Sequence, residues 1–148
     1  MFIKPYNVYR ISHFLYTKGL PVLPNLLTLL CRLVFGCYFP HTIITKGEVV
    51  LGYGGLGVVV HGNVVFGRDC HVDQGVTIGG TSKKEQVPCL GDHVYVGAGA
   101  KILGPISIGN NVVIGANSVV VKSIPDHSLV VGVPGKVIKT GIIKSDYV

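Results

Sequence analysis

The stretch VYVGAGAKILGPISIGNNVVIGANSVV (residues 94–120) repeats its pattern every six residues. A large apolar residue begins each step, and a small or apolar residue stands two places before it. A simple strand alternates with a period of two, so a period of six predicts short strands and turns that wind as a coil. The same phase extends back to residue 60, and its large apolar members are Val60, Phe66, Val72, Ile78, Leu90, Val96, Ile102, Ile108, Ile114 and Val120.

Three such hexads form a triangular coil of about eighteen residues, and each strand of a coil pairs with the strand of the coil below. The repeat therefore predicts a parallel β-helix from about Val60 to Ile124. A glycine-rich β-sandwich is the alternative, but its strands do not keep one phase over so long a stretch. The composition agrees with a folded, turn-rich chain, because 48% of residues are hydrophobic, 14% are charged and 21 are glycine.

The repeat is interrupted at residues 81–88, which are mostly polar or charged. We interpret this segment as an extruded loop that takes the place of one hexad. Loops on rigid scaffolds often carry function, although a solvated bulge without function fits the pattern equally well.

If the loop counts as one hexad, residues eighteen apart fall into columns along the helix. Two neighbouring columns then consist of very small residues, which predicts a groove for a thin ligand such as a pantetheine arm. His61 and Gly79 begin one column. The other contains Gly62, Gly80, Ala98, Ala116 and Pro134.

The N-terminal part reads as helical between residues 5 and 39, with Gly19 ending a first helix and a second helix following Pro24. The second helix carries an apolar stripe, which we expect to pack against the β-helix. Contact of residues 20–39 with a membrane surface is the alternative. We expect a helical segment at 1–40, a β-helix at 41–138 and a tail at 139–148. The stripe consists of Leu26, Leu27, Leu30, Leu33 and Val34.

The net charge of +6 favours an anionic partner, such as a ligand that carries phosphate. The basic residues are scattered and only Lys83 and Lys84 are adjacent, so no nucleic-acid partner is expected. The four cysteines lack zinc-site spacing, and the N-terminal residues 1–10 lack the apolar run of a signal peptide. We therefore expect a cytoplasmic protein without a metal.

Four stretches resemble the hexapeptide-repeat acyltransferases, and among them most closely the serine acetyltransferases: YRISHFL (9–15), VTIGGT (76–81), VGAGAKILG (96–104) and VGVPGKV (131–137). This resemblance implies a left-handed parallel β-helix, an exception to the usual right-handed crossover. It also implies acetyl-CoA as acyl donor and a homotrimer with active sites between subunits.

Two departures from the serine acetyltransferases concern the acceptor. Those enzymes have an Asp-His pair where this chain has Tyr53-Gly54, and an Arg-His pair where it has Gln86-Val87. The main expectation is therefore an O-acetyltransferase that acts on a sugar hydroxyl of surface polysaccharide or its precursor, with serine as the alternative acceptor. A non-catalytic scaffold and a metal hydrolyase are the remaining alternatives, and the hydrolyase would need closely spaced histidines that this chain lacks.

An alcohol needs a base to attack a thioester, and neutral histidine is the usual base. We predict His61 as this base, with His71 and Asp73 as further candidates, and backbone N–H groups near the loop as donors to the oxyanion. The attack is expected to be direct, without an acyl-enzyme. The positions expected to bind the cofactor are Gly79, Gly80, Ala98, Ala116 and Lys136.

Overall fold

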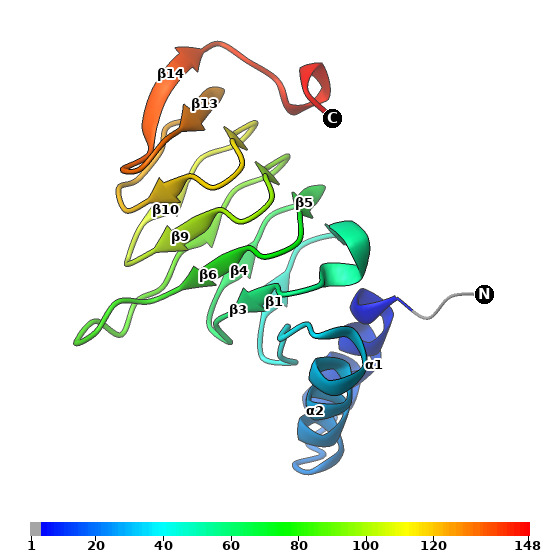
Figure 1. The fold of residues 1–148 in the computed structure, drawn as a ribbon. Coiled ribbons are helices and arrows are strands. Elements are labelled where there is room, and N and C mark those ends of the chain that lie inside the picture. The colour runs from blue at the N-terminus through cyan, green and yellow to red at the C-terminus, as the bar shows by residue number, and fades with distance from the viewer. Residues whose placement is uncertain (1–3) are drawn as a thin grey trace.

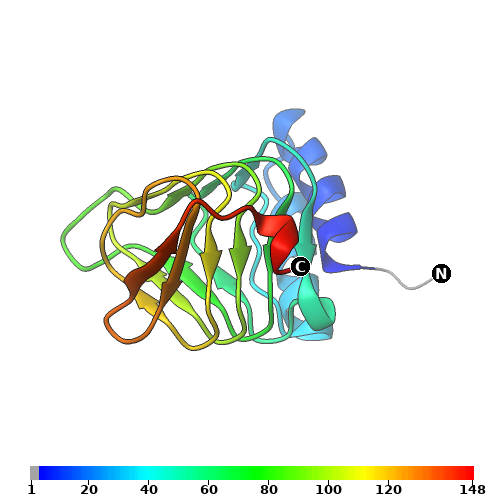
Figure 2. The same ribbon diagram turned by 90° about the horizontal axis from the view of Figure 1, so that it is seen from above.

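The structure is a computed structural model that describes residues 4–148. It is a mainly β parallel solenoid with two helices at its N-terminal end, the left-handed β-helix that the hexads predict. Figure 1 shows the coils stacked from the helices to the C-terminal strands β13 and β14. Figure 2 looks along the stack, where the coils have a triangular outline and one loop projects from a corner.

Three sheets form the faces of the triangle, and each coil passes through sheets B, C and A in that order. Sheet A consists of β3 (Val59–Val60), β6 (Thr77–Gly79), β9 (Lys101–Leu103) and β12 (Val119–Val120). Sheet B consists of β1 (Ile44–Thr45), β4 (Val65–Phe66), β7 (Cys89–Leu90) and β10 (Ser107–Ile108). Sheet C consists of β2 (Val49–Leu51), β5 (Cys70–Val72), β8 (Tyr95–Val96), β11 (Val113–Ile114), β13 (Ser128–Val131) and β14 (Lys136–Thr140).

All pairs are parallel except the C-terminal hairpin of β13 and β14. Two short 3₁₀ turns complete the elements: η1 (Gly52–Gly55), where sheet C passes to sheet A, and η2 (Lys144–Asp146) near the C-terminus. We name the corners by the sheets they join. The C/A corner lies between sheets C and A, the A/B corner between A and B, and the B/C corner between B and C.

The hexad positions form the core, as predicted. All ten large apolar residues from Val60 to Val120 are buried. Full burial of one such side chain contributes about 1.5–3 kcal/mol. Cys70, at a small inward position, is buried too, and this burial raises the pKa of its thiol to about 11. Cys70 is therefore a packing residue, as expected from its place in the hexad, because a protonated thiol is a poor nucleophile.

The coils differ in length, and this corrects the predicted columns. Val59 pairs with Thr77, 18 residues later, but Thr77 pairs with Lys101, 24 residues later. The loop is therefore added to its hexad and does not replace it. Both lengths are multiples of six, so the apolar phase is the same in either case.

The single predicted column of small residues is consequently wrong. Gly79 pairs with Leu103, so Gly80 lies at the A/B corner, one coil above Gly62. Ala98 and Ala116 lie at the C/A corner, at the other end of the sheet A strands. Pro134 lies in the turn between β13 and β14.

The helices α1 (Pro5–Thr17) and α2 (Leu23–Phe35) form a hairpin below the first coil (Figure 1). Gly36 caps α2 in the left-handed conformation at φ 61°, which glycine adopts without steric cost. Gly19 has φ 79° just beyond α1. Both helices and both glycine stops agree with the sequence prediction.

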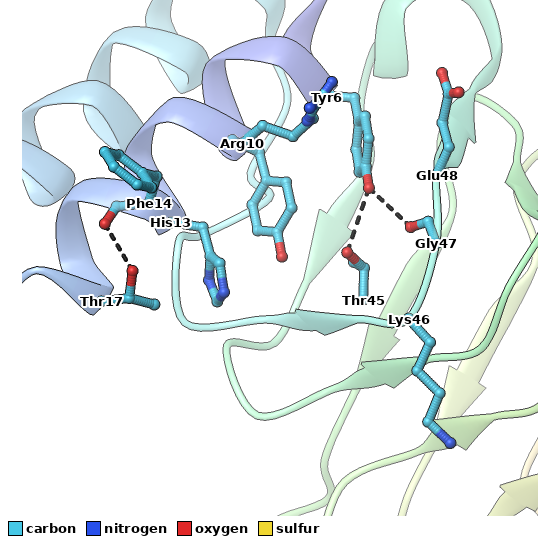
Figure 3. Close-up of a pocket in the computed structure, with 10 residues that line it drawn as sticks. Tyr6, Arg10, His13, Phe14, Thr17, Thr45, Lys46, Gly47 and Glu48 are labelled. Carbon is cyan, nitrogen blue, oxygen red and sulfur yellow. Dashed lines mark hydrogen bonds between the residues drawn. The ribbon is translucent and has the colours of Figure 1, made fainter.

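Two tyrosines attach α1 to the β-helix. The Tyr6 hydroxyl donates a hydrogen bond of 2.8 Å to the Gly47 carbonyl, and the Tyr9 hydroxyl donates one of 2.8 Å to the Ile43 carbonyl. Figure 3 shows Tyr6 directed from α1 toward Thr45 and Gly47. The aromatic rings of α1 also contact Phe39, so α1 covers the open end of the core.

The packing predicted for the α2 stripe is wrong. Leu26, Leu30, Leu33 and Val34 are exposed, and the buried side chains of α2 are Pro24 and Cys31. Because α1 already covers the end of the core, α2 packs in a second layer against α1. Within residues 4–148, neither helix is long and apolar enough to cross a membrane.

Glycines stack at the B/C corner, where a β-carbon has no room. A β-carbon on Gly67 would overlap the carbonyl of Gly91, and one on Gly91 would lie 2.9 Å from the Gly109 carbonyl. Gly67→Ala is expected to destabilise the fold by about 3 kcal/mol, because the colliding atoms are backbone. Urea unfolding followed by circular dichroism measures this loss. The matched control is Gly79→Ala, whose β-carbon meets nothing within 4 Å; equal midpoints for the two variants would contradict the prediction.

Candidate active site

A hydrogen-bonded cluster of His71, Asp73 and Tyr95 lies on the outer face of sheet C. His71 on β5 and Tyr95 on β8 are partners in register, and their ring centroids are 5.2 Å apart. The His71 Nε2 atom lies 3.1 Å from Asp73 Oδ1, and the Tyr95 hydroxyl donates to Asp73 Oδ2. Two predicted catalytic candidates, His71 and Asp73, are therefore in direct contact.

The hydrogen bonds of this cluster determine where its protons lie. An ionised carboxylate only accepts hydrogen bonds, so the His71 proton is on Nε2 and Nδ1 has a free lone pair. No residue among 4–148 bonds to Nδ1. The hydrogen bond to Asp73 and burial together raise the pKa of Tyr95 to about 12, so the phenol remains a neutral donor. The side chains of His71 and Asp73 are 23% and 17% exposed, which leaves the pair accessible to a small substrate.

The cluster lies beside the first turn of the C/A corner. Leu51 pairs with Val72, so η1 and Asp73 follow their strands side by side. A β-carbon on Gly52 would overlap the Asp73 carboxylate, which explains the small residue there. The dipeptide Tyr53-Gly54 is in this turn, with positive φ at both residues. His71 and Asp73 therefore lie one coil above the position where serine acetyltransferases have an Asp-His pair.

Above the cluster, the C/A corner forms a column of small residues with free backbone donors. Ala98 is half-buried and Ala116 is exposed, and their backbone N–H groups have no hydrogen-bond partner within the described residues. At the foot of the column, the Oε1 atom of Gln74 is buried and also lacks a partner there. At its upper end, Val119 and Gly132 are joined by a backbone hydrogen bond, and Lys136 pairs with Val131.

The remaining predicted residues lie at the A/B corner. The His61 N–H donates a 2.8 Å hydrogen bond to the Ile78 carbonyl, so His61 lies one coil below Gly79, as predicted. Its Nδ1 atom accepts a 3.2 Å hydrogen bond from the Asn63 N–H, which puts the proton of a neutral ring on Nε2. A ring bonded in this way has its lone pair engaged. His61 is thus less suited to act as a base than His71, and its catalytic role stays a prediction, as do the cofactor roles of Gly79 and Gly80.

Tyr95 and Gln74 were not identified from the sequence. An outward tyrosine on a β-helix strand has no distinctive pattern, and its contact with His71 spans the coil that contains the loop. The signal existed in the register: with a 24-residue coil, Tyr95 stacks directly above His71.

The single chain has neither a metal cluster nor a deep cavity at these residues. No group of three metal-binding side chains occurs in the part of the chain that the structure describes, residues 4–148. A pocket of about 460 Å³ lies between α1 and residues 45–48, in the region drawn in Figure 3. It contains none of the predicted site residues.

Comparison with known proteins connects these features to a family. Residues 90–122 match the family model described as bacterial transferase hexapeptide (six repeats). The serine acetyltransferase of Synechococcus elongatus is 44% identical over 140 residues, which are 93% of this chain and 57% of that protein. Among solved structures, the serine acetyltransferase of Neisseria gonorrhoeae has a TM-score of 0.87 at 36% identity, covering 93% of this chain and 53% of that one. A coenzyme A complex of the Brucella abortus enzyme has a TM-score of 0.86 at 32% identity, covering 92% and 55%.

The chain spans little more than half the length of these relatives. Their similarity extends along nearly all of this chain, and they are named for serine. This contradicts the prediction of a polysaccharide sugar as acceptor and supports the alternative, serine.

Proposed function

We propose, from the premise that this chain is a hexapeptide-repeat protein of the bacterial transferase type and a relative of serine acetyltransferases, that it transfers the acetyl group of acetyl-CoA to the hydroxyl of serine. The observation that carries the proposal is the base-ready His71–Asp73 pair at the foot of a column with free N–H donors.

The C/A corner suits the long arm of acetyl-CoA. Neighbouring coils are about 4.8 Å apart, so the column from Gln74 to Gly132 extends over roughly 14 Å. The N–H groups of Ala98 and Ala116 are free to donate to the amide carbonyls of the arm. Lys136, near the upper end, is a cation for the phosphates, and the thioester then lies near His71. A coenzyme A complex of a relative with the same fold supports this ligand.

Direct transfer follows from the His71 tautomer. His71 Nδ1 takes the proton of the serine hydroxyl while the oxygen forms a bond to the acetyl carbonyl carbon. The tetrahedral intermediate then expels the CoA thiolate, which takes the proton from the imidazolium. The Asp73 carboxylate stabilises the imidazolium and holds the ring, and Tyr95 holds the carboxylate.

Serine differs from a sugar by its ammonium and carboxylate groups. The unpaired Oε1 atom of Gln74 is an acceptor for an ammonium group and lies next to the His71–Asp73 pair in the chain. This acceptor compensates in part for the Asp-His and Arg-His pairs that the chain lacks at Tyr53-Gly54 and Gln86-Val87.

The assembly that we propose is a homotrimer. The loop at 81–88 and the column of Ala98 and Ala116 lie at opposite ends of sheet A, too far apart to form one pocket in a single chain. A ring of subunits brings the A/B corner of one copy to the C/A corner of the next. His61, Gly79, Gly80 and the loop would then close the site from the neighbouring subunit. Light scattering is expected to give the mass of three copies.

The test of the proposed function is the release of free CoA thiol from acetyl-CoA, with L-serine as acceptor. L-serine is expected to raise the release rate at least about tenfold over buffer, with O-acetylserine identified by mass spectrometry. Alanine has the same charged groups but no hydroxyl, so it is the matched control. Tight acetyl-CoA binding without serine-dependent release would contradict serine as the acceptor.

A further inference from the structure

The outward face of α2 consists almost entirely of large apolar side chains. Leu26 is 58% exposed, Leu33 is 74% exposed and Val34 is 62% exposed. These residues recur at the spacing of one helix face, opposite the buried Pro24 and Cys31. Exposed apolar side chains of the hairpin on or near this face are Ile11, Phe14, Leu20, Val22, Leu23, Leu26, Leu29, Leu30, Leu33 and Val34.

A water-exposed helix normally has its polar residues on this face. A helix that is apolar on all sides is usually covered by protein or lipid, and a contiguous exposed patch marks an interaction site. The α2 helix has 13 residues and contains only Asn25, Thr28 and Arg32 as polar side chains.

Charge identifies the kind of surface that covers this face. Residues 4–46 contain five cations and no acidic residue, and all five cations are exposed. The first acidic residue is Glu48, which Figure 3 shows on the β-helix side of α1. The cations are Lys4, Arg10, Lys18, Arg32 and Lys46.

We propose that the outer face of the α1–α2 hairpin binds an anionic lipid surface. The leucines enter the boundary between headgroups and acyl chains, and the long basic side chains reach the lipid phosphates. A second copy of this chain is a poor occupant, because it would bring the same cations together without a carboxylate to pair them. The hairpin lies at the N-terminal end of the β-helix, so docking leaves the C/A corner open to substrates (Figure 1).

Vesicle flotation with the full chain tests the proposal. The protein is expected to float with vesicles of phosphatidylglycerol and phosphatidylcholine in equal parts, and to stay at the bottom with pure phosphatidylcholine. Raising the salt concentration is expected to release it, since each Lys or Arg near such a surface contributes about fivefold to binding at low salt.

Two pairs of variants separate the apolar and charged contributions. Leu26→Ser with Leu33→Ser is expected to abolish flotation, and Arg32→Glu with Lys18→Glu to lower it at least about twentyfold. The matched controls are Val121→Ser and Lys122→Glu, which change exposed residues of the same types far from the hairpin. All variants change exposed side chains outside the proposed site, so thermal melts and CoA release are expected to match the parent protein.

Other outcomes overturn the proposal. Flotation that is equal with neutral vesicles, or unchanged in the leucine variant, would show that this face does not bind anionic lipid. Absence of flotation together with a larger assembly that the leucine variant dissociates would show that a second copy covers the face. Neither result depends on whether serine is the acceptor, so the two proposals fail separately.

Discussion

The His71→Ala variant is expected to lose about 10²- to 10⁴-fold in kcat for acetyl transfer, which is the usual contribution of a general base. His71 is the histidine whose hydrogen bond to Asp73 leaves Nδ1 free to accept a proton. The side chain lies on the outer face of sheet C and is not part of the core, so the variant should fold and bind CoA with an unchanged Kd. Steady-state kinetics with serine and calorimetric titration with CoA measure the two quantities.

Three further variants make this test specific. Asp73→Asn removes the charge that stabilises the imidazolium and is expected to lower kcat less than His71→Ala does. Tyr95→Phe removes only one of the two hydrogen bonds to Asp73 and is expected to cost less than tenfold. His61→Ala is the matched histidine control at the A/B corner. Full activity of His71→Ala combined with loss of activity in His61→Ala would assign the base to His61 instead.

The fold was predictable from sequence because the hexad is a packing rule. A large apolar side chain at every sixth position fills one face of the coil, and any other phase would expose Val60, Ile78 or Ile102. The two helices were predictable for a similar reason, since Gly19 and Gly36 mark their ends. The length of each coil was not predictable. An inserted hexad and a replaced hexad keep the same apolar phase, and only the pairing of Thr77 with Lys101 distinguishes them.

The candidate site depends on coil length, so it was only partly predictable. His71 and Asp73 were recognised as reactive types, but their partner Tyr95 lies across the long coil. The same error joined Gly80 to Ala98, which are at different corners. The surface of α2 was mispredicted for another reason: a leucine stripe shows that a helix face will be covered, but its period does not identify what covers it.

The site also shows how an active-site pair can be exchanged within a β-helix. Neighbouring coils offer equivalent outward positions about 4.8 Å apart. The pair absent at Tyr53-Gly54 has a counterpart one coil higher, where His71 and Asp73 stand two residues apart on β5 and at its end. Such an exchange keeps the acyl donor at the same corner, because the column of Ala98 and Ala116 starts from that coil. The residues that hold the acceptor are then free to differ.

The Ala116→Phe variant is expected to raise the KM for acetyl-CoA about 100-fold. Ala116 is exposed, so a phenyl ring fits without disturbing the core, but it would fill the column and block the free N–H groups of Ala98 and Ala116. Losing two such hydrogen bonds and the contacts of the arm costs roughly 3 kcal/mol, which corresponds to this change.

The control for Ala116→Phe is Arg68→Phe, which adds the same ring at the B/C corner. Arg68 forms an exposed ion pair with Asp92, which contributes little to stability. Its variant is expected to keep the KM of the parent protein. If instead Ala116→Phe kept a normal KM while a bulky residue at Gly80 raised it, acetyl-CoA would lie along the A/B corner. The register of the long coil makes these two outcomes exclusive, because it puts Gly80 and Ala116 at opposite ends of sheet A.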